Sequence, residues 1–485
     1  MHHANLERGM LSGTATKRSR RWTVEKTFQF SNTHHELMAR DEEFVFGWRY
    51  EPRVIFESGK GIVLKDVDGR EYIDLTAGMM CMVLGHSHPE LTETIREQAG
   101  KLVHQSSWYS NPWLVEFAEL IASTLPGDLK VVNFAVTGSE ANEVAMRMAL
   151  GVTGRYDVVS VIRGLHGGSL AAEAVTSVGG GRKAHLGPLM MPSHRNAIYA
   201  PLCYRCPVNL TYPGCNVACL DHSEELMEHV TSQNVAVIMA ETIPVAGGMV
   251  VPPAEWLPRL RDLADRWGAM LVLDEAQLAP AKTGKMWAFE HYDVIPDILT
   301  FGKGMTAGMG IAGTVTTSAI AEEARGKAGL PWGGTYSGDP LPAAVALKQL
   351  QIVLRDKLTE KAIPLGERME AGLRALAAKY EVIGDVRGIG LYYMLDIVES
   401  PEGRRPNHAM AERIRYNALL EGLVLIAVKN FIRICPALII TEAEIDDALA
   451  RLDVAIERSV AGFPSNLDFS TSSSLAARAP VAAGA

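Results

Sequence analysis

The sequence lacks long apolar segments. It has no run of about 18 or more apolar residues, and no apolar stretch near the N-terminus precedes a small-residue cleavage site. These absences argue against a membrane-spanning helix and a secretory signal, so we expect no membrane partner and a cytoplasmic location. A basic surplus is also missing, because the formal net charge is -9. Without a broad positive field, we expect no nucleic-acid partner.

Cysteine is scarce, with 6 residues in a chain of 485. So few thiols in this length do not make a disulfide scaffold, and a cytoplasmic setting would keep them reduced. Four of them cluster in CYRCPVNLTYPGCNVACL, namely Cys203, Cys206, Cys215 and Cys219. Such a cluster could close on zinc or an iron–sulfur cluster, but it has no histidine partners and no standard finger spacing. We therefore expect reduced thiols in an ordered or dimer-contact loop, and no bound metal.

The composition that remains is that of an ordinary globular protein, with 47% hydrophobic and 21% charged residues. A length of 485 residues exceeds one usual core and predicts two lobes. We expect residues 1–27 to form a disordered leader. Residues 463–485 are rich in Ser and Ala and predict a disordered tail.

Hydrophobic periodicity predicts an α/β protein. Residues 61–75 alternate apolar and polar side chains around Asp68-Gly69, which is typical of a hairpin. From about residue 88 to 330, helical segments alternate with short apolar runs such as 235–241 and 269–275. Such runs suit strands that are buried on both faces, and the alternation predicts a mainly parallel sheet. After residue 340 long helices and short strands predict a second lobe, closed by a helix that Thr441 opens.

Two residues at predicted strand ends carry chemistry. Asp274 ends the strand AMLVLD, where a buried carboxylate needs a cationic partner such as a protonated pyridine nitrogen. Lys303 follows an apolar strand in ILTFGKGM, beside Gly302 and Gly304, which let the backbone pass close to a ligand. A lysine that loses water there can act as an amine nucleophile. Taken singly, Asp274 could also be a strand-end cap and Lys303 a surface lysine.

Two further segments suit a phosphate group. Gly138 and Ser139 lie in VTGSEANE, at a strand-to-helix junction where free amides and a hydroxyl can bind a phosphate monoester. A serine-capped helix start is the alternative interpretation. Thr335, in the Gly-rich segment GGTYSGDP, offers another hydroxyl donor. An ordinary loop would also account for it.

Together these segments resemble the class III aminotransferases, which use pyridoxal 5'-phosphate, and the 2,2-dialkylglycine decarboxylase branch is the most similar. The resemblance covers residues from about 45 to 460. It rests on LGHSHPEL (84–91), TGSEANE (137–143), HGG (166–168), LDEAQ (273–277), PDILTFGK (296–303), SGDPLPAA (337–344), IGDVRGIGL (383–391) and FIRICPALIIT (431–441). As an ordered set these motifs are highly specific.

The resemblance implies an α/β fold, that of the fold type I pyridoxal-phosphate transferases. In such a fold a large domain with a mainly parallel seven-stranded sheet is joined to a smaller α+β domain made by both ends of the chain. We expect the small domain to comprise residues 28–87 and 341–462, and the large cofactor-binding domain to comprise residues 88–340.

The resemblance also implies roles for these residues. Lys303 would form a Schiff base with the cofactor and shuttle the proton, while Asp274 keeps the pyridine nitrogen protonated. Gly138 and Ser139 would hold the phosphate. Thr335 would reach the phosphate of the neighbouring subunit, which predicts a homodimer or a tetramer.

Further residues would surround the ring and the substrate. Leu165 stands where the family usually has an aromatic residue that stacks on the ring, and Ala276 would cover the opposite face. Gln277 would approach the phenolic oxygen of the cofactor or the substrate carboxylate. Arg433 matches the family's carboxylate-binding arginine, since a guanidinium fork suits a carboxylate. Glu241 could pair with an arginine, position the substrate or be a buried structural carboxylate.

Substrate specificity departs from the branch pattern. Trp108 matches a segment that lines the substrate entrance in relatives, and residues 278–285 replace the family's Gly-rich loop. Met79 stands where the decarboxylase branch has a glutamine that orients the scissile carboxylate, and a thioether cannot donate a hydrogen bond. We therefore expect an aminotransferase that moves an amino group between an amino acid or amine and a 2-oxo acid. The alternatives are a decarboxylating transaminase, a racemase, a lyase, or a metal-binding or scaffolding protein that has lost the chemistry.

Overall fold

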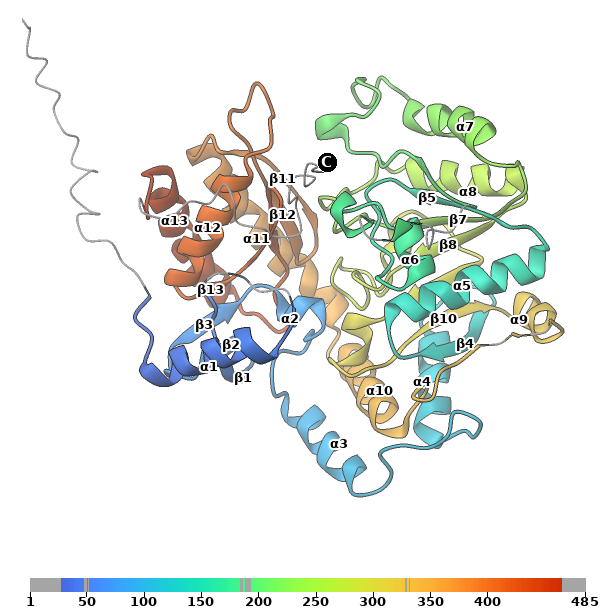
Figure 1. Ribbon diagram of the computed structural model, residues 1–485, viewed down its shortest axis with the longest axis horizontal. Helices are drawn as coiled ribbons and strands as arrows, with labels where there is room; N and C mark the ends of the chain where they lie inside the picture. The colour runs from blue at the N-terminus through green and yellow to red at the C-terminus, as the bar shows by residue number, and fades with distance from the viewer. Residues whose placement is uncertain are drawn as a thin grey trace, which may run out of the picture.

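The computed structural model describes residues 28–464, apart from residues 48–49, 51, 184–185, 188–192, 328 and 331. The predicted leader over residues 1–27 lies outside the described residues, as does the predicted tail from residue 465 onward. Two lobes stand side by side (Figure 1). None of the helices in the described part of the chain is long and apolar enough to cross a membrane.

The larger lobe is built on a seven-stranded sheet. In sheet order its strands are β4 (Leu129–Ala135), β10 (Ala312–Thr317), β9 (Ile298–Phe301), β8 (Met270–Asp274), β7 (Val235–Glu241), β5 (Asp157–Val161) and β6 (His194–Ile198). Strands β9, β8, β7, β5 and β6 pair in parallel, whereas β10 runs antiparallel to both β4 and β9. The predicted mainly parallel sheet is confirmed.

Helices cover both faces of this sheet. They are α3 (Pro89–Ala99), α4 (Pro112–Ser123), α5 (Gly138–Thr153), α6 (Leu170–Val175), α7 (Ala218–Val230), α8 (Trp256–Trp267), α9 (Ser318–Arg325) and α10 (Pro340–Arg355). Every residue of β7 is buried. Val237 and Met239 pack in the cluster that holds α5 and α9, while Ile238 and Ala240 join the core with α4 and α8. Because side chains alternate along a strand, a strand covered on both faces is apolar throughout.

The smaller lobe takes strands from both ends of the chain. One sheet has the order β1 (Phe56–Lys60), β2 (Val63–Asp66), β3 (Glu71–Asp74) and β13 (Leu423–Val424). The predicted hairpin is confirmed, since β2 and β3 pair antiparallel. Strand β13 adds in parallel, with Leu423 opposite Ile73. A second, antiparallel sheet has the order β11 (Ile383–Ile389), β12 (Tyr392–Ile397), β15 (Phe431–Ile434) and β14 (Ile426–Val428).

Among the described residues, five helices complete the smaller lobe: α1 (Asn32–Phe44), α2 (Ala77–Met80), α11 (Leu358–Lys379), α12 (His408–Leu420) and α13 (Glu442–Val460). The predicted start of α13 is confirmed. The Thr441 hydroxyl accepts from the Glu444 amide, and the Glu444 carboxylate accepts from the Thr441 amide, which forms a capping box. Both long helices expected after residue 340 are present, but only α11 belongs to the smaller lobe. Helix α10 packs against α4 and α3 of the larger lobe, and Lys357 in the left-handed conformation separates it from α11.

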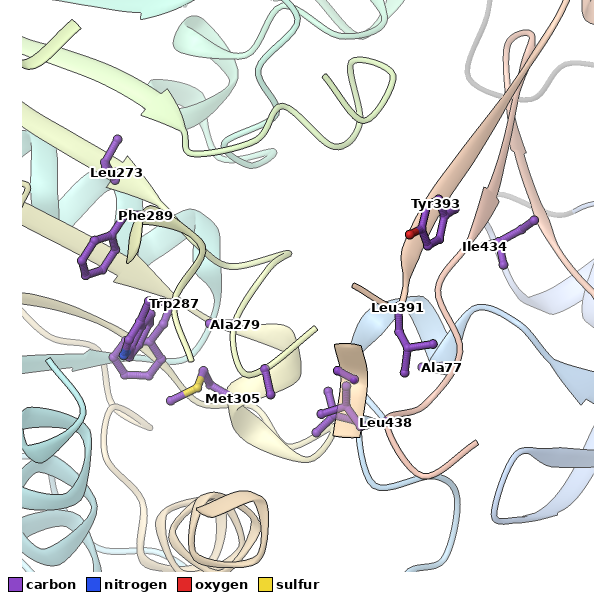
Figure 2. Close-up of a cluster of buried hydrophobic side chains, with 14 of the residues drawn as sticks. Ala77, Leu273, Ala279, Trp287, Phe289, Met305, Leu391, Tyr393, Ile434 and Leu438 are labelled. Carbon is purple, nitrogen blue, oxygen red and sulfur yellow. The ribbon is translucent and has the colours of Figure 1, made fainter. Parts of the chain in front are cut away.

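Buried apolar side chains join the two lobes (Figure 2). Trp287 comes from the loop after β8, and Met305 from the short 3-10 helix after β9. Leu391 comes from the turn between β11 and β12, and Ile434 from β15 of the antiparallel sheet of the smaller lobe. Leu438 lies between them, and its amide donates to the Val83 carbonyl at 2.8 Å. The junction therefore has the character of a core, which fixes the smaller lobe beside the carboxyl ends of the large sheet.

Candidate active site

The two predicted strand-end residues lie at the same edge of the large sheet. Strand β8 ends at Asp274, and its parallel neighbour β9 is followed by Gly302 and Lys303. Asp274 pairs with Thr300 in register, so both strands deliver their last residues to the carboxyl edge. Ligands of open parallel sheets bind at this edge.

Asp274 is held as a carboxylate by its neighbours. Its Oδ2 accepts from the Asn142 amide at 2.8 Å and lies 3.0 Å from Nδ1 of His166, and its Oδ1 accepts from the Ala276 amide at 3.0 Å. Burial raises the pKa of Asp274, but its contacts with His166, Ala276 and Asn142 outweigh burial and lower the pKa below its ordinary value. The side chain of Asp274 is therefore an ionised carboxylate, which can pair with a positively charged group of a ligand.

Sequence reasoning missed two of these partners. Asn142 lies four residues after Gly138, on the buried face of α5, and its Oδ1 accepts from the Thr300 hydroxyl at 2.7 Å. An amide on a buried helix face is the signal that could have found it. His166 belongs to the HGG motif, yet its contact with Asp274 spans separate elements.

Lys303 opens a short 3-10 helix with a φ of 38°, in the left-handed region that side-chain-bearing residues seldom adopt and that is enriched at functional sites. The glycine before it sits against two other site residues. A Cβ placed at Gly302 would lie 3.7 Å from both the Ala276 Cβ and the Gly138 Cα. The strand end, the helix start and the lysine thus share one small space.

A cavity of about 240 Å³ opens over Lys303. Its lining includes Lys303, Gln277, Leu165, Met79, Arg433 and Lys429. Five of these were predicted site residues, and they come from both lobes. Within the described ranges, no carboxylate lies within ion-pair distance of the Lys303 amine. The amine is therefore available to a ligand.

Gly138 and Ser139 begin α5, as predicted. Thr137 caps the helix and forms a capping box with Glu140, whose carboxylate accepts from the Val136 and Thr137 amides at 2.8 and 3.1 Å. The first-turn amides of Gly138 and Ser139 have no acceptor inside the helix. The Ser139 hydroxyl accepts from the Ser169 amide at 3.0 Å, which turns it toward the loop that follows HGG. This end of the site suits an anion.

Arg433 lies on β15 and is 4% exposed. Its Nη1 lies 3.6 Å from the sulfur of Met80, and its Nε has no hydrogen-bond partner among the described residues. No described carboxylate forms an ion pair with it. A buried guanidinium in this state has unused donors, which point to an anionic ligand.

Glu241 contacts an amide rather than an arginine. Gln277 donates to its Oε2 at 3.0 Å, and the Leu165 and Val245 amides donate at 2.9 and 3.2 Å. The arginine pairing considered from the sequence is not found among the described residues. Burial raises the pKa of Glu241 to about 7. The neighbouring His166 lowers this pKa, and the negative charge of Asp274 raises it. Glu241 orients Gln277 and the backbone of Leu165, two residues that line the cavity.

A pH dependence follows from Glu241. The folded carboxyl keeps its proton up to about pH 7, whereas an unfolded glutamate loses its proton near pH 4.5. Its contribution to the free energy of unfolding, on the order of 3 kcal/mol, is full below pH 4.5 and is lost as the pH rises through 7. We expect the unfolding temperature of Glu241→Gln to fall less between pH 5 and 8 than that of the unchanged protein. Equal slopes in both proteins would contradict this assignment.

Trp108 and Thr335 lie outside the cavity. Trp108 is 92% exposed and Thr335 is exposed. The segments that carry them are neighbours, because Asn111 donates to the Gly338 carbonyl at 3.0 Å. Within this single chain, neither side chain reaches the space above Lys303.

Similarity to known proteins identifies the family. The sequence model that describes the class III aminotransferases matches residues 47–456. The chain belongs to the class III aminotransferase family.

Two curated relatives and one solved structure illustrate the range of this family. A 5-aminovalerate aminotransferase of Pseudomonas aeruginosa is 33% identical over 82% of this chain and 92% of the relative. A leucine/methionine racemase of Thermococcus litoralis is 30% identical over 84% of this chain and 91% of the relative. An amine transaminase from an uncultivated Pseudomonas species, solved with bound pyridoxal phosphate, matches 86% of this chain and 98% of its own, with 28% identity and a TM-score of 0.80.

The class III aminotransferase described here has the fold type I architecture that the sequence predicted, and its cofactor is pyridoxal 5'-phosphate. The residues present fit this cofactor. The unpaired Lys303 amine suits an aldehyde, the anionic Asp274 suits a protonated pyridine nitrogen, and the start of α5 suits a phosphate. Ala276 and Leu165 offer small apolar contacts to a planar ring.

Proposed function

We propose that Lys303 holds pyridoxal phosphate covalently through its Nζ, and that Arg433 binds the carboxylate of the amino donor and then that of the 2-oxo acid. The observation that carries this proposal is that Lys303 and Arg433, both without a carboxylate partner among the described residues, line one cavity. When bound, the cofactor supplies an electron sink for the bond that breaks at the substrate carbon.

The chain's own residues would then have distinct tasks. The Lys303 amine removes a proton from one carbon and returns it to another, as a general base and then as a general acid. Asp274 stays ionised and holds the charge of the pyridine nitrogen. Gln277 is fixed by Glu241 at 3.0 Å and presents its amide toward the cavity.

Single-turnover mixing tests this proposal. Purified protein with bound cofactor is mixed with a panel of α-amino acids, ω-amino acids and amines, and the cofactor absorbance is followed without any 2-oxo acid. We expect the visible band to convert to the amine form of the cofactor with at least one donor, and to return when a 2-oxo acid is added. A band that no donor converts would contradict transamination.

A second positive charge points to the class of acceptor. Lys429 lines the same cavity as Arg433, is half-buried, and has no ion-pair partner among the described residues. Arg182 also lines the cavity, but Glu173 neutralises it at 2.6 Å. Two separate unpaired cations suit a ligand with two carboxylates, so we propose a dicarboxylic 2-oxo acid as the acceptor.

Replacing Lys429 by methionine tests the second cation. Because a hydrogen-bonded charge contributes about 1.5 to 3 kcal/mol, we expect KM for a dicarboxylic 2-oxo acid to rise about 10- to 100-fold. KM for pyruvate should change less than about 2-fold, since pyruvate has one carboxylate. Equal effects on both acceptors would show that Lys429 does not discriminate between them.

Racemisation is the second candidate, because a relative that is 30% identical is a racemase. A racemase exchanges the α-proton without a 2-oxo acid and loses no amino group. Incubation of each L-amino acid in heavy water, with chiral chromatography, separates the two functions. Accumulation of the D-isomer with no amine form of the cofactor would favour the racemase.

The resemblance to the 2,2-dialkylglycine decarboxylase branch is also open to test, at Met79. This side chain is 51% exposed and lines the cavity with Lys303, but its thioether donates no hydrogen bond. We expect the unchanged protein to release little carbon dioxide from 2-aminoisobutyrate. Met79→Gln restores a donor and should raise the release about 10-fold. If the unchanged protein releases carbon dioxide rapidly and Met79→Gln does not alter that rate, the scissile carboxylate does not lie beside residue 79.

We propose a homodimer in which Thr335 reaches the phosphate of the neighbouring subunit. In one chain Thr335 is exposed, next to Tyr336 at 61% exposure and to the segment of Trp108. Large exposed aromatic side chains gathered in this way favour a protein contact. Light scattering of the holoenzyme should give a dimer or a tetramer, and a monomer with full activity would contradict the shared site.

We also propose a cytoplasmic location. None of the six cysteines, all of which lie in the described part of the chain, forms a disulfide, and reduced cysteines are the state that the cytosol maintains. Fractionation of the source cells, followed by immunodetection, tests this. Recovery from a secreted or membrane fraction would overturn it.

A further inference from the structure

Four of the six cysteines surround one small cavity between β6 and α7. These are Cys203, Cys206, Cys215 and Cys219, and the cavity measures about 20 Å³. The other walls are mainly prolines and aliphatic side chains, among them Leu202, Val208 and Leu210. The thiols are therefore the chief polarisable groups that face this space.

One of these sulfurs already accepts a hydrogen bond, because the Leu210 amide donates to the Cys206 sulfur at 3.4 Å. An amide donor of this kind stabilises a sulfur that carries negative charge.

We propose that the four cysteines bind one divalent zinc-type ion as thiolates. Each thiol loses one proton to solvent when its sulfur–metal bond forms, so the occupied site has a net charge of -2 and no electron is transferred. The cavity is about the size that one water molecule needs, which suits a single ion rather than a four-iron cluster.

Metal binding requires the sulfurs to move inward. Among the described residues, the one trio whose ligand atoms all lie within 4.8 Å of one another is His34, Asp66 and Asp68, so the cysteine sulfurs are more widely spaced than that. A zinc–sulfur bond is about 2.3 Å long, and rotation about one side-chain bond of each cysteine moves its sulfur. The spacing along the sequence alone favours free thiols. The shared cavity is the observation that changes this expectation.

The ion would brace the contact between the lobes. Arg205, between Cys203 and Cys206, donates to both carboxylate oxygens of Asp396 on β12 at 2.6 and 2.7 Å. Arg404 donates to the Tyr204 carbonyl at 2.7 Å. This cysteine cavity shares no lining residue with the cavity over Lys303, so the site is structural and independent of the proposed function.

Elemental analysis of the purified holoenzyme tests the proposal. Protein from zinc-supplemented medium is dialysed and measured by mass spectrometry of metals, then titrated with a mercurial thiol reagent while a dye reports released zinc. We expect about one zinc ion per chain, released as four thiols react, with a fall in unfolding temperature that added zinc reverses. Cys206→Ser and Cys215→Ser should each lose at least 80% of the zinc, whereas the control Cys81→Ser retains it.

Several results would overturn the site. The first is a zinc content below about 0.1 ion per chain, both in the purified protein and after the reduced protein has been incubated with zinc. The second is zinc that stays bound in both Cys206→Ser and Cys215→Ser. The others are stoichiometric iron with sulfide, or two disulfides found by intact mass under non-reducing conditions. Should the variants not fold, mercurial release from the unchanged holoenzyme, and its reversal, still decide the question.

Discussion

Lys303→Ala is expected to abolish transamination and the visible band of the bound cofactor. The change removes both the covalent attachment and the amine that moves the proton, and we expect turnover to fall by about 10⁴-fold or more. Absorbance spectra of the reconstituted protein and a single-turnover assay with a good donor measure the two effects. Asp274 and the start of α5 at Gly138 and Ser139 remain, so the cofactor should still bind, without a covalent link.

Lys285→Ala is the matched control, because this lysine lies in the loop between β8 and β9 but is exposed and outside the cavity. It should keep both the band and the turnover. Borohydride reduction followed by peptide mapping gives an independent check, since the reduced cofactor should be found on the peptide that contains Lys303. Recovery of the cofactor on another lysine would refute the assignment.

Asp274→Asn is expected to lower the rate of the first half-reaction by roughly 10²- to 10³-fold, the usual loss for one preorganised charge contact. The amide oxygen can still accept from Asn142 or Ala276, so the fold should survive while the negative charge is lost. Rapid mixing of the donor with a cofactor-saturated variant measures this rate. Cofactor content is measured separately, so weak binding is not mistaken for slow chemistry.

Glu275 supplies the comparison for Asp274. It follows Asp274 directly, is fully buried, and accepts from the Ala288 and Phe289 amides at 2.8 and 3.0 Å. Burial raises the pKa of Glu275 to about 7. Glu275→Gln should therefore change stability but leave the half-reaction within about 3-fold. Equal losses in both variants would mean that Asp274 acts through packing.

The sequence was sufficient for features that depend on one strand and the residues after it. Asp274 and Lys303 follow apolar runs, and parallel strands bring their carboxyl ends to one edge, so their proximity could be expected. The start of α5 at Gly138 and the capping box at Thr441 were also visible, because caps are local.

Features that depend on distant segments were not visible in the sequence. Nothing near Asn142 or His166 indicates that both contact Asp274, because the three residues lie on separate elements. Met79 was predicted as a site residue, but the left-handed backbone that puts it on the cavity wall, with φ of 62°, was not, because propensity disfavours this conformation in methionine. The role predicted for Thr335 requires a second chain.

The pairing of β3 with β13 has a consequence for biosynthesis. Ile73 emerges early from the ribosome, but its partner Leu423 is made only after most of the chain. At roughly 5 to 20 residues per second, the hairpin waits on the order of tens of seconds with an unpaired edge. Such an edge is a template for the wrong partner. The nascent enzyme should therefore depend on chaperones more than its stability suggests, and a truncation before residue 423 should aggregate even though the large sheet is complete.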